Sequence, residues 1–369
     1  MKLLICTWSL TGGGAERVAS IWASEFVKFG YAVDFLLGSF TKPISYKIPK
    51  SCNIFHICPV NDKVALRFIP KFLKKMFIRK TLSKSKPDII ISVMPDMAKL
   101  VKDSLKVNQK IPIIITEHNS YDWGNYTPMP DYIYNQKFDS NLKYNATTVL
   151  TKVDYNILKE KGQEFVRNTF VLPNPVSFDP LDKIPPKRKT IVAAGRLDAW
   201  KYKGFDTLLN AWSLIESSYQ DWSLQIAGNG DKKYLLNLCK KLGLKRVKFL
   251  GFVNTKECFE YSSIFVLSSR YEGFGMVLLE AMSQGCACIA CDHKGRQSEI
   301  ITNQEQGCII PPDNPQIMAS AIKKLIDEEE FRNNIQKGAL SRSRDYMPEK
   351  IVREFEKIIF KVIKYEEKL

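Results

Sequence analysis

The sequence has 369 residues, which at roughly 100–200 residues per domain predicts two globular domains. Its composition, 45% hydrophobic and 25% charged, excludes both a disulfide-stapled miniprotein and a disordered chain. The 55 Lys and Arg residues outnumber the 39 Asp and Glu residues and give a net charge of +16. This charge indicates an anionic partner, such as nucleic acid, phospholipid or a phosphorylated substrate.

Cysteine usage and hydropathy indicate a cytoplasmic protein. The nine cysteines are odd in number and lie in apolar runs, which is typical of reduced thiols. The apolar stretch at 3–10 has no small-residue cleavage site, so we expect no secretion signal. No window supplies the ~18 apolar residues that a membrane span needs.

Short β-rich runs alternate with helical patterns along the first half of the chain. This alternation predicts a parallel sheet with helices on both faces. We therefore expect an N-terminal Rossmann-like domain over 1–172. Its candidate strands are 2–8, 31–37, 88–94, 112–116 and 146–151.

A proline-rich segment at 173–189 interrupts the rhythm and predicts an interdomain linker, because it has five prolines and no apolar period. A second alternating series predicts another Rossmann-like domain over 190–347. Residues 348–369 carry apolar residues spaced as one helical face, which predicts a C-terminal helix that could cross back to the first domain. The candidate strands of the second domain are 190–195, 223–228, 247–251, 264–268, 286–291 and 307–311.

A cysteine cluster in the second domain has two interpretations. Cys286, Cys288 and Cys291 could hold a metal ion, but no second Cys or His pair follows at zinc-site spacing. Alternation within a short apolar run instead predicts a buried strand.

A glycine-rich loop joins the first strand to an apolar-striped helix. Glycines let a ligand approach the backbone, and a helix N-terminus favours negative charge. Gly12 and Gly14 also fit a dinucleotide fingerprint with Asp34 as its acidic residue, whereas Arg17 occupies the third glycine position, where a side chain obstructs helix packing. We prefer an anion or substrate loop at Gly13 and Gly14, with Arg17 beside it. A purely structural turn is the alternative.

A basic loop follows the first strand of the second domain. Arg196 comes directly after the strand, and Lys201 and Lys203 lie a few residues later. Such cations suit a diphosphate, because Arg can bind in a bidentate manner and Lys acts as a point charge. For Lys201 a solvated position is the alternative.

Residues 272–280 follow another strand and open a helix, whose first N–H groups can cradle phosphate. Glu272 lies on the loop, and Glu280, about two turns into the helix, could accept a pair of sugar hydroxyls. The alternatives are a helix cap for Glu272 and a surface position for Glu280. The cradle residues are Gly273, Phe274, Gly275, Met276 and Val277.

Five motifs occur in order along almost the whole chain. They are GGGAER at 12–17, GRLDxxxxKGFDTLL at 195–209, AGNG at 227–230, FLGFV at 249–253 and EGFGMVLLEAMSQG at 272–285. The set resembles a retaining GT-B glycosyltransferase of the bacterial family 4 type. The implied fold class is α/β, with two doubly wound Rossmann-like domains that face an interdomain cleft.

The resemblance implies transfer of a sugar from a nucleotide diphosphate donor, a UDP-sugar, with retention at the anomeric carbon. Arg196 and Lys203 would bind the donor diphosphate, although the family's usual spacing favours Lys201. Glu280 would bind the ribose, and Glu272 would meet the sugar and phosphates.

The resemblance places further donor contacts on loops at strand ends. Phe252 and Val253 would read the base, and Gly228 would approach the donor. The departing diphosphate oxygen would take the acceptor proton, so no general base is assigned. The chain has no Asp-x-Asp motif, and we expect neither a metal ion nor a cofactor.

His118 ends a strand of the first domain, before a long polar loop. It resembles the family's acceptor-side histidine, so an active-site role is preferred over a structural loop role.

The segment 63–86 is basic and aromatic, with no acidic residue. A basic amphipathic helix of this kind contacts anionic membranes or lipid phosphates, whereas an ordinary core helix with solvated lysines is the alternative. Nucleic acid is a competing partner, but no recognised nucleic-acid module is present, so none is expected. The candidate acceptor or membrane cations are Arg67, Lys71, Lys74, Lys75 and Arg79.

The sequence therefore predicts a transferase on the cytoplasmic face of a bacterial inner membrane. The layout resembles enzymes that extend undecaprenyl-diphosphate-linked glycans, particularly with N-acetylgalactosamine. A sugar-nucleotide epimerase or hydrolase and a non-catalytic nucleotide-sugar-binding protein are the rival functions.

Overall fold

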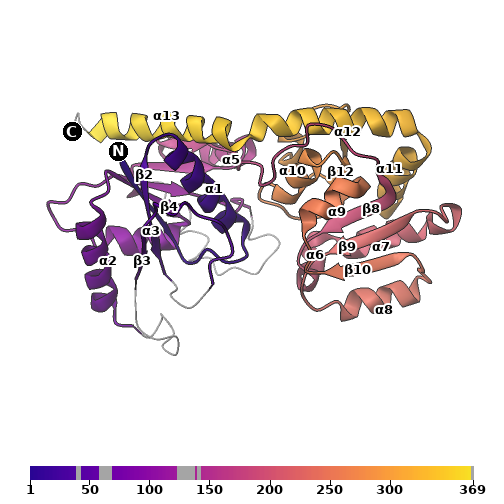
Figure 1. Ribbon diagram of the computed structural model, residues 1–369, viewed down its shortest axis with the longest axis horizontal. Coiled ribbons are helices and arrows are strands. Elements are labelled where there is room, and N and C mark those ends of the chain that lie inside the picture. Colours follow the sequence, from indigo (N-terminus) through magenta and orange to yellow (C-terminus); the bar gives the residue numbers. More distant parts are fainter. Residues whose placement is uncertain (39–42, 58–68, 123–137, 139–142, 367–369) are drawn as a thin grey trace. The chain divides into compact units, whose positions relative to one another are not determined.

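The computed structural model describes residues 1–38, 43–57, 69–122, 138 and 143–366 (Figure 1). The chain forms two compact units: Met1–Pro175 with Pro348–Leu369, and Val176–Met347. The division after residue 175 falls inside the segment predicted as a linker. Residues 188 and 189 of that segment already belong to a strand of the second unit.

The first unit contains a seven-stranded sheet in which all neighbouring strands are parallel. The strand order is β3-β2-β1-β4-β5-β6-β7. Apart from the two edge strands β3 and β7, each strand corresponds to a predicted run. The strands are β1 Lys2–Thr7, β2 Ala32–Leu37, β3 Ile54–His56, β4 Ile89–Val93, β5 Ile113–Thr116, β6 Ala146–Val149 and β7 Thr169–Val171.

Helices bury both faces of this sheet, so its strands are continuous apolar runs rather than alternating ones. Ile78 and Leu82 of α2 and Met97 of α3 pack into the core on one face. The helix α1 contacts β1, β2 and β4. The helical elements are α1 Gly14–Lys28, α2 Lys71–Ser85, α3 Pro95–Lys102, α5 Lys152–Lys161, the short 3-10 helix η3 Gln163–Phe165 and the C-terminal α13 Pro348–Glu366.

The C-terminal helix α13 packs against α1 within the first unit (Figure 1). The Phe355 ring is fully buried and lies 5.0 Å from the Trp22 ring and 5.8 Å from the Phe26 ring. The Tyr31 hydroxyl donates a hydrogen bond to Glu356. Burial, together with this carboxylate, raises the pKa of Tyr31 to about 12.

The second unit contains a six-stranded parallel sheet with the order β10-β9-β8-β11-β12-β13. The predicted cysteine-rich strand is β12, whose five residues are all buried. Burial raises the pKa of Cys286 to about 11 and that of Cys291 to about 12. The strands are β8 Arg188–Ala194, β9 Ser223–Ala227, β10 Val247–Gly251, β11 Ser262–Leu267, β12 Ala287–Cys291 and β13 Cys308–Ile310.

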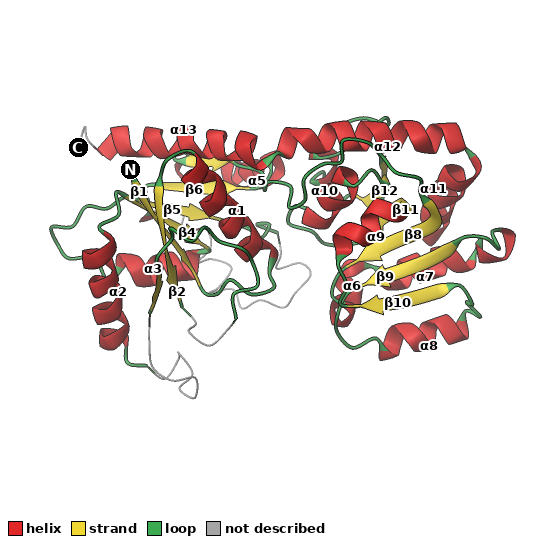
Figure 2. Ribbon diagram, in the orientation of Figure 1, coloured by secondary structure: helices red, strands yellow, loops and turns green. Residues whose placement is uncertain are grey.

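Helices also cover the second sheet (Figure 2). Leu208 and Trp212 of α7, Leu235 of α8 and Met318 of α11 pack into one core with the strands. The helices are α6 Trp200–Lys203, α7 Phe205–Ser213, α8 Lys233–Lys241, α9 Thr255–Tyr261, α10 Met276–Ser283, α11 Pro315–Asp327 and α12 Glu329–Ser343. Four 3-10 turns complete the unit: η4 Leu197–Ala199, η5 Glu216–Ser218, η6 Gln297–Glu299 and η7 Arg344–Tyr346.

Lys187, just before β8, donates hydrogen bonds to carbonyl groups at the C-terminal ends of two helices. Its ammonium donates to the carbonyls of Phe259 and Glu260, at the end of α9, and of Gln284, which follows α10, at 3.1, 2.7 and 2.6 Å. A cation is favourable there because carbonyls at helix C-termini lack intrahelical partners.

None of the helices in the described ranges combines the length and the apolar character needed to cross a bilayer.

We predict that Phe355→Ala lowers the free energy of unfolding of the first unit by about 3–5 kcal/mol, because it leaves a cavity between α1 and α13. Phe360→Ala on the same helix is the matched control, since Phe360 is 46% exposed and should change stability by less than about 1 kcal/mol. Urea unfolding of both variants measures the difference. Equal losses of unfolding free energy in the two variants would contradict the packing of Phe355 between α1 and α13.

Candidate functional site

The carboxyl ends of β8 and β11 define the candidate site of the second unit. These strands are neighbours, and the chain proceeds from β8 to β9 and β10 on one side and from β11 to β12 and β13 on the other. Such a reversal of strand order is where open α/β sheets bind ligands. Arg196 follows β8 and Glu272 follows β11, so the topology brings the two predicted motifs to this edge.

The floor of this edge is made of main chain. A Cβ atom on Gly228 would lie 1.8 Å from the carbonyl oxygen of Gly195, and one on Gly204 would lie 1.9 Å from that of Ser268. Gly204 and Gly228 also have φ values of +60° and +148°, which favour glycine. The loops after β8, β9 and β11 therefore pack backbone to backbone, and no side chain fits between them.

Lys203 and Glu272 form an ion pair on this floor, with 2.6 Å between Nζ and Oε1. Both side chains are largely buried, with exposed fractions of 26% and 14%. The Ser269 hydroxyl donates to the same carboxylate oxygen at 2.8 Å. Lys201 is exposed, and its ammonium lies 5.6 Å from the Trp200 ring centre. The structure thus brings Lys203, rather than Lys201, to Glu272.

Arg196 points elsewhere. Its guanidinium is bidentate to Asp198, with distances of 2.8 and 3.2 Å, and its side chain is 75% exposed. Hydrogen bonding to Asp198 raises the pKa of Arg196, and the same contact lowers the pKa of Asp198. Arg196 is therefore a solvated cation at the rim of the site.

The helix α10 begins at Met276, after Gly275 with φ +102°. Glu280 is the fifth residue of this helix, one turn from its start, so the prediction of two turns is wrong. It is only 4% exposed, which rules out the alternative of a surface position.

The other residues predicted to bind the donor differ in exposure. Phe274 is buried and its carbonyl accepts from Gln297, whereas Gly273, Met276 and Val277 are half-buried. Phe252 lies after β10 and is 86% exposed, and Val253 follows it. These residues form the start of α10 and an exposed aromatic at the neighbouring strand end.

Sequence reasoning missed Arg270, which lies two residues before Glu272. Its guanidinium forms ion pairs with Asp206 at 2.7 Å and with Asp313. Burial opposes the charged form, but these carboxylates outweigh it and raise the pKa of Arg270. The signal available in the sequence was an arginine two residues before the glutamate motif.

The glycine-rich loop of the first unit lies between β1 and α1. Gly13 precedes the helix and Gly14 is its first residue. The Gly13 carbonyl accepts from the Arg17 amide at 3.1 Å and from the Tyr46 hydroxyl at 3.0 Å. The Arg17 guanidinium lies 5.3 Å from the Tyr46 ring centre. The loop is thus a defined turn in which the Gly13 carbonyl already accepts two hydrogen bonds.

His118 follows β5 in the first unit. Its Nε2 lies 3.2 Å from the Thr116 hydroxyl, and its ring lies 5.6 Å from that of Trp22 on α1. Burial lowers the pKa of His118 to about 4, while the Asn174 side chain has a smaller opposing effect. The ring is therefore neutral near pH 7.

The basic helix predicted within 63–86 is α2, and Arg67 lies outside the described residues. Lys71 pairs with Asp103 at 3.0 Å, and Arg79 Nε donates to the Ser104 carbonyl at 2.9 Å. An acidic residue that directly follows α3 thus offsets part of the positive charge predicted for this segment. Lys74 and Lys75 are half-buried.

The outer face of α2 carries apolar and basic side chains together. Phe72 is 68% and Met76 is 52% exposed, and Lys80 is exposed beside them. Ile78 and Leu82 face the core instead. Lys80 was not among the candidate cations, although residues four apart share a helix face.

Two known families match the chain. Residues 12–179 match "Glycosyltransferase Family 4" and residues 180–342 match "Glycosyl transferases group 1". A Campylobacter jejuni relative is named "GalNAc-alpha-(1->4)-GalNAc-alpha-(1->3)-diNAcBac-PP-undecaprenol alpha-1,4-N-acetyl-D-galactosaminyltransferase". It is 28% identical, over 98% of this chain and 99% of its own.

Solved structures share the fold, among them sucrose-phosphate synthase and HepE. Sucrose-phosphate synthase from Thermosynechococcus elongatus has a TM-score of 0.81 at 17% identity, over 99% of this chain and 100% of its own. HepE from Anabaena, solved in complex with UDP, has a TM-score of 0.74 at 17% identity, over 98% of this chain and 100% of its own.

We predict that His118 destabilises the folded protein as the pH falls. The unfolded histidine titrates near 6.5 and the folded one at about 4, so between these values the unfolded state binds more protons. Between pH 7 and pH 5 the free energy of unfolding should fall by up to about 2 kcal/mol more in the native protein than in His118→Gln. Urea unfolding of both proteins at the two pH values measures this, and identical pH dependence would show that the ring protonates freely.

Proposed function

We propose a donor and an acceptor for this chain, which belongs to the family 4 and group 1 glycosyltransferases and is a hexosyltransferase of the GT-B fold. The donor is a UDP-sugar, with N-acetylhexosamine such as N-acetylgalactosamine, or a hexose, as the sugar. The acceptor is a lipid-diphosphate-linked glycan, and the anomeric configuration is retained. The observation that carries the proposal is the Lys203 to Glu272 pair beside the start of α10.

The donor diphosphate binds on the main-chain floor of the second unit. Lys203 supplies the cation nearest to the floor, and Arg196 supplies a second, solvated one. The helix start at Met276 favours negative charge as well. The UDP complex of HepE, which has the same fold, supports UDP as the nucleotide.

Two further side chains recognise the nucleoside, and the exposed fraction of each suits its proposed role. Glu280 is buried on α10, and its carboxylate can accept hydrogen bonds from both ribose hydroxyls. Phe252 is exposed at the end of β10, where its ring can stack on the base.

Transfer breaks the bond between the anomeric carbon and the diphosphate oxygen. A bond to the acceptor oxygen forms on the same face of the sugar, and the acceptor proton passes to the departing oxygen. Lys203 and Arg196 stabilise the charge that develops on that diphosphate, which is the largest electrostatic contribution. Glu272 orients the sugar and Lys203. His118, neutral at pH 7, contacts the acceptor through hydrogen bonds and not through charge.

The acceptor is held at an anionic membrane surface, on the cytoplasmic face, by α2. Its outer face combines Phe72 and Met76, which can insert between lipids, with basic residues that attract phosphate. The C. jejuni relative, whose name specifies an undecaprenyl-diphosphate-linked acceptor, supports a lipid-linked substrate.

We predict that UDP raises the melting temperature and that the two lysines differ. UDP at a hundred times its dissociation constant should add about 2.7 kcal/mol to the free energy of unfolding. Lys203→Met should weaken UDP binding roughly 10- to 100-fold, because it removes a charged hydrogen bond. Lys201→Met is the matched control and should leave binding unchanged.

Calorimetry measures both affinities, and NMR of the product tests retention at the anomeric carbon. Turnover of UDP-sugar without any acceptor would favour an epimerase or hydrolase. Absence of UDP binding by the native protein would overturn the proposed donor.

We also predict binding to vesicles that contain phosphatidylglycerol. The variant Phe72→Ser, Met76→Ser, Lys80→Glu should bind more than tenfold more weakly, since it loses two apolar anchors and a cation worth about 1 kcal/mol at the surface. Lys159→Glu, on the exposed side of α5, is the charge-matched control. Sedimentation with these vesicles and with phosphatidylcholine vesicles measures binding. Equal sedimentation of the triple variant and Lys159→Glu would show that α2 is an ordinary surface helix that does not bind the membrane.

A further inference from the structure

We propose that Arg270 is a positioning residue of the donor site: its guanidinium fixes the loop that carries Lys203 to the loop that carries Glu272. The inference rests on the proposed role of Lys203 in donor binding. Arg270 acts through Lys203 and does not itself contact the donor.

The hydrogen-bonding capacity of Arg270 is fully used within the protein. Nη1 donates to Asp206 and to the carbonyl of Lys201, both at 2.7 Å. Nη2 donates to the other Asp206 oxygen and to the Thr207 hydroxyl, both at 2.9 Å, and Nε donates to Asp313. A guanidinium has five N–H groups, and these five contacts account for all of them. In this arrangement no donor remains for a phosphate.

The same two loops are joined by further hydrogen bonds to the carbonyls of Tyr202 and Lys203. The Arg270 amide donates to the Tyr202 carbonyl at 2.8 Å, and the Ser268 hydroxyl donates to the Lys203 carbonyl at 2.7 Å. The ammonium end of Lys203 is held by Glu272. Both ends of the lysine are therefore fixed before any ligand binds, which is the preorganisation that electrostatic stabilisation needs.

Only an arginine can make this set of contacts. The three acidic or hydroxyl partners come from the start of α7 and from Asp313, which precedes α11. A planar fork spans these separate segments, whereas a lysine ammonium has three donors at one point. Asp313 has φ +58°, a left-handed conformation that Asp adopts more readily than most residues other than glycine, and its carboxylate pairs with Arg270.

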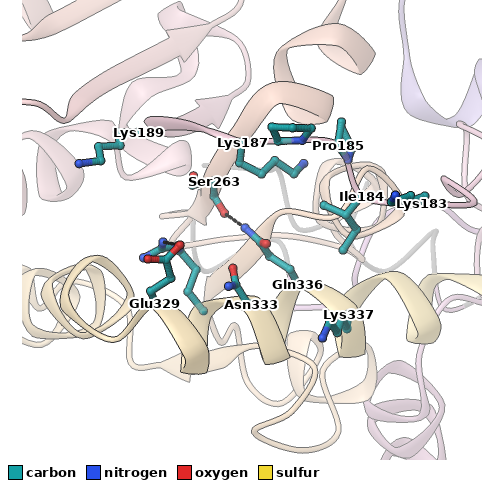
Figure 3. Close-up of a pocket in the computed structure, with 12 residues that line it drawn as sticks. Lys183, Ile184, Pro185, Lys187, Lys189, Ser263, Glu329, Asn333, Gln336 and Lys337 are labelled. Carbon is teal, nitrogen blue, oxygen red and sulfur yellow. Dashed lines mark hydrogen bonds and ion pairs between the residues drawn. The ribbon is translucent and has the colours of Figure 1, made fainter.

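The test compares Arg270→Lys with Arg332→Lys. Arg332 is a matched control because its side chain is also largely buried, at 11% exposed, and donates to the carbonyls of Leu325 and Ile326 at 2.7 and 3.1 Å. It belongs to the same unit but lines a cavity of about 560 Å³ near the start of β8. Figure 3 shows residues that line this cavity, among them Lys187 and Gln336 of α12, whose side-chain amide donates to the Ser263 carbonyl.

Two measurements are made on the full chain. Hydrogen exchange of the segment 199–207 reports whether the loop is held, without any ligand. Arg270→Lys should raise exchange there at least tenfold and Arg332→Lys should not. Calorimetry with UDP should show at least tenfold weaker binding for Arg270→Lys and a change of less than twofold for Arg332→Lys, at a temperature where both are folded.

A double variant tests whether Arg270 acts through Lys203. In the Lys203→Met background, Arg270→Lys should weaken UDP binding no further. A full additional loss would show that Arg270 contributes by a separate route and would overturn the inference.

Failure of the inference differs from failure of the proposed donor. If native protein binds UDP but Arg270→Lys binds it equally well, the inference is wrong and the donor stands. If native protein binds no UDP, the donor is wrong, and the inference falls with it even where exchange in 199–207 rises. Unchanged exchange in that segment contradicts the proposed fixing of the loop whatever UDP does.

Discussion

The ion pair between Lys203 and Glu272 is the interaction on which the site of the second unit depends. Two largely buried charges are tolerable only when each is paired and hydrogen-bonded, because an unpaired buried charge is strongly destabilising. The surrounding contacts follow from that requirement. Ser269 donates to the carboxylate, the stem of Lys203 lies over Gly195, and Arg270 joins the loops on which both charges stand. In the proposed donor site, a cation held in this way would meet a diphosphate with little reorganisation.

The first unit has a comparable dependence, centred on Trp22. Its ring contacts Phe355 of α13 on one side and His118 on another. The C-terminal helix α13 thus supports α1, whose Trp22 ring packs against His118. Burial lowers the pKa of His118 and keeps the imidazole neutral. Through Trp22, a helix more than 200 residues away in the sequence packs into the same aromatic cluster as a histidine that follows a strand.

The fold class and family were predictable from the sequence, and the structure and the family matches confirm both. Short β-rich runs between helical patterns identify most of the parallel strands, whereas β3 and β7, with three residues each at sheet edges, are too short to leave a signal. The choice between Lys201 and Lys203 was not predictable. Residues two apart on a helix point to nearly opposite sides, and the orientation of α6 is set by Gly204 against Ser268. Arg270 pairs with Asp206 and Asp313, which lie far from it in the sequence, so no local sequence pattern could predict these contacts.

The glycine floor has a consequence for how this site can acquire new substrates. At Gly204 and Gly228 a Cβ atom would lie within 2 Å of a main-chain oxygen, so these two positions can accept almost no substitution. If the proposed donor binds here, preference for one nucleotide or sugar over another would depend on the surrounding side chains, at positions such as the exposed Phe252 and the half-buried Met276. A library built to redirect the enzyme should vary those side chains and leave the floor intact.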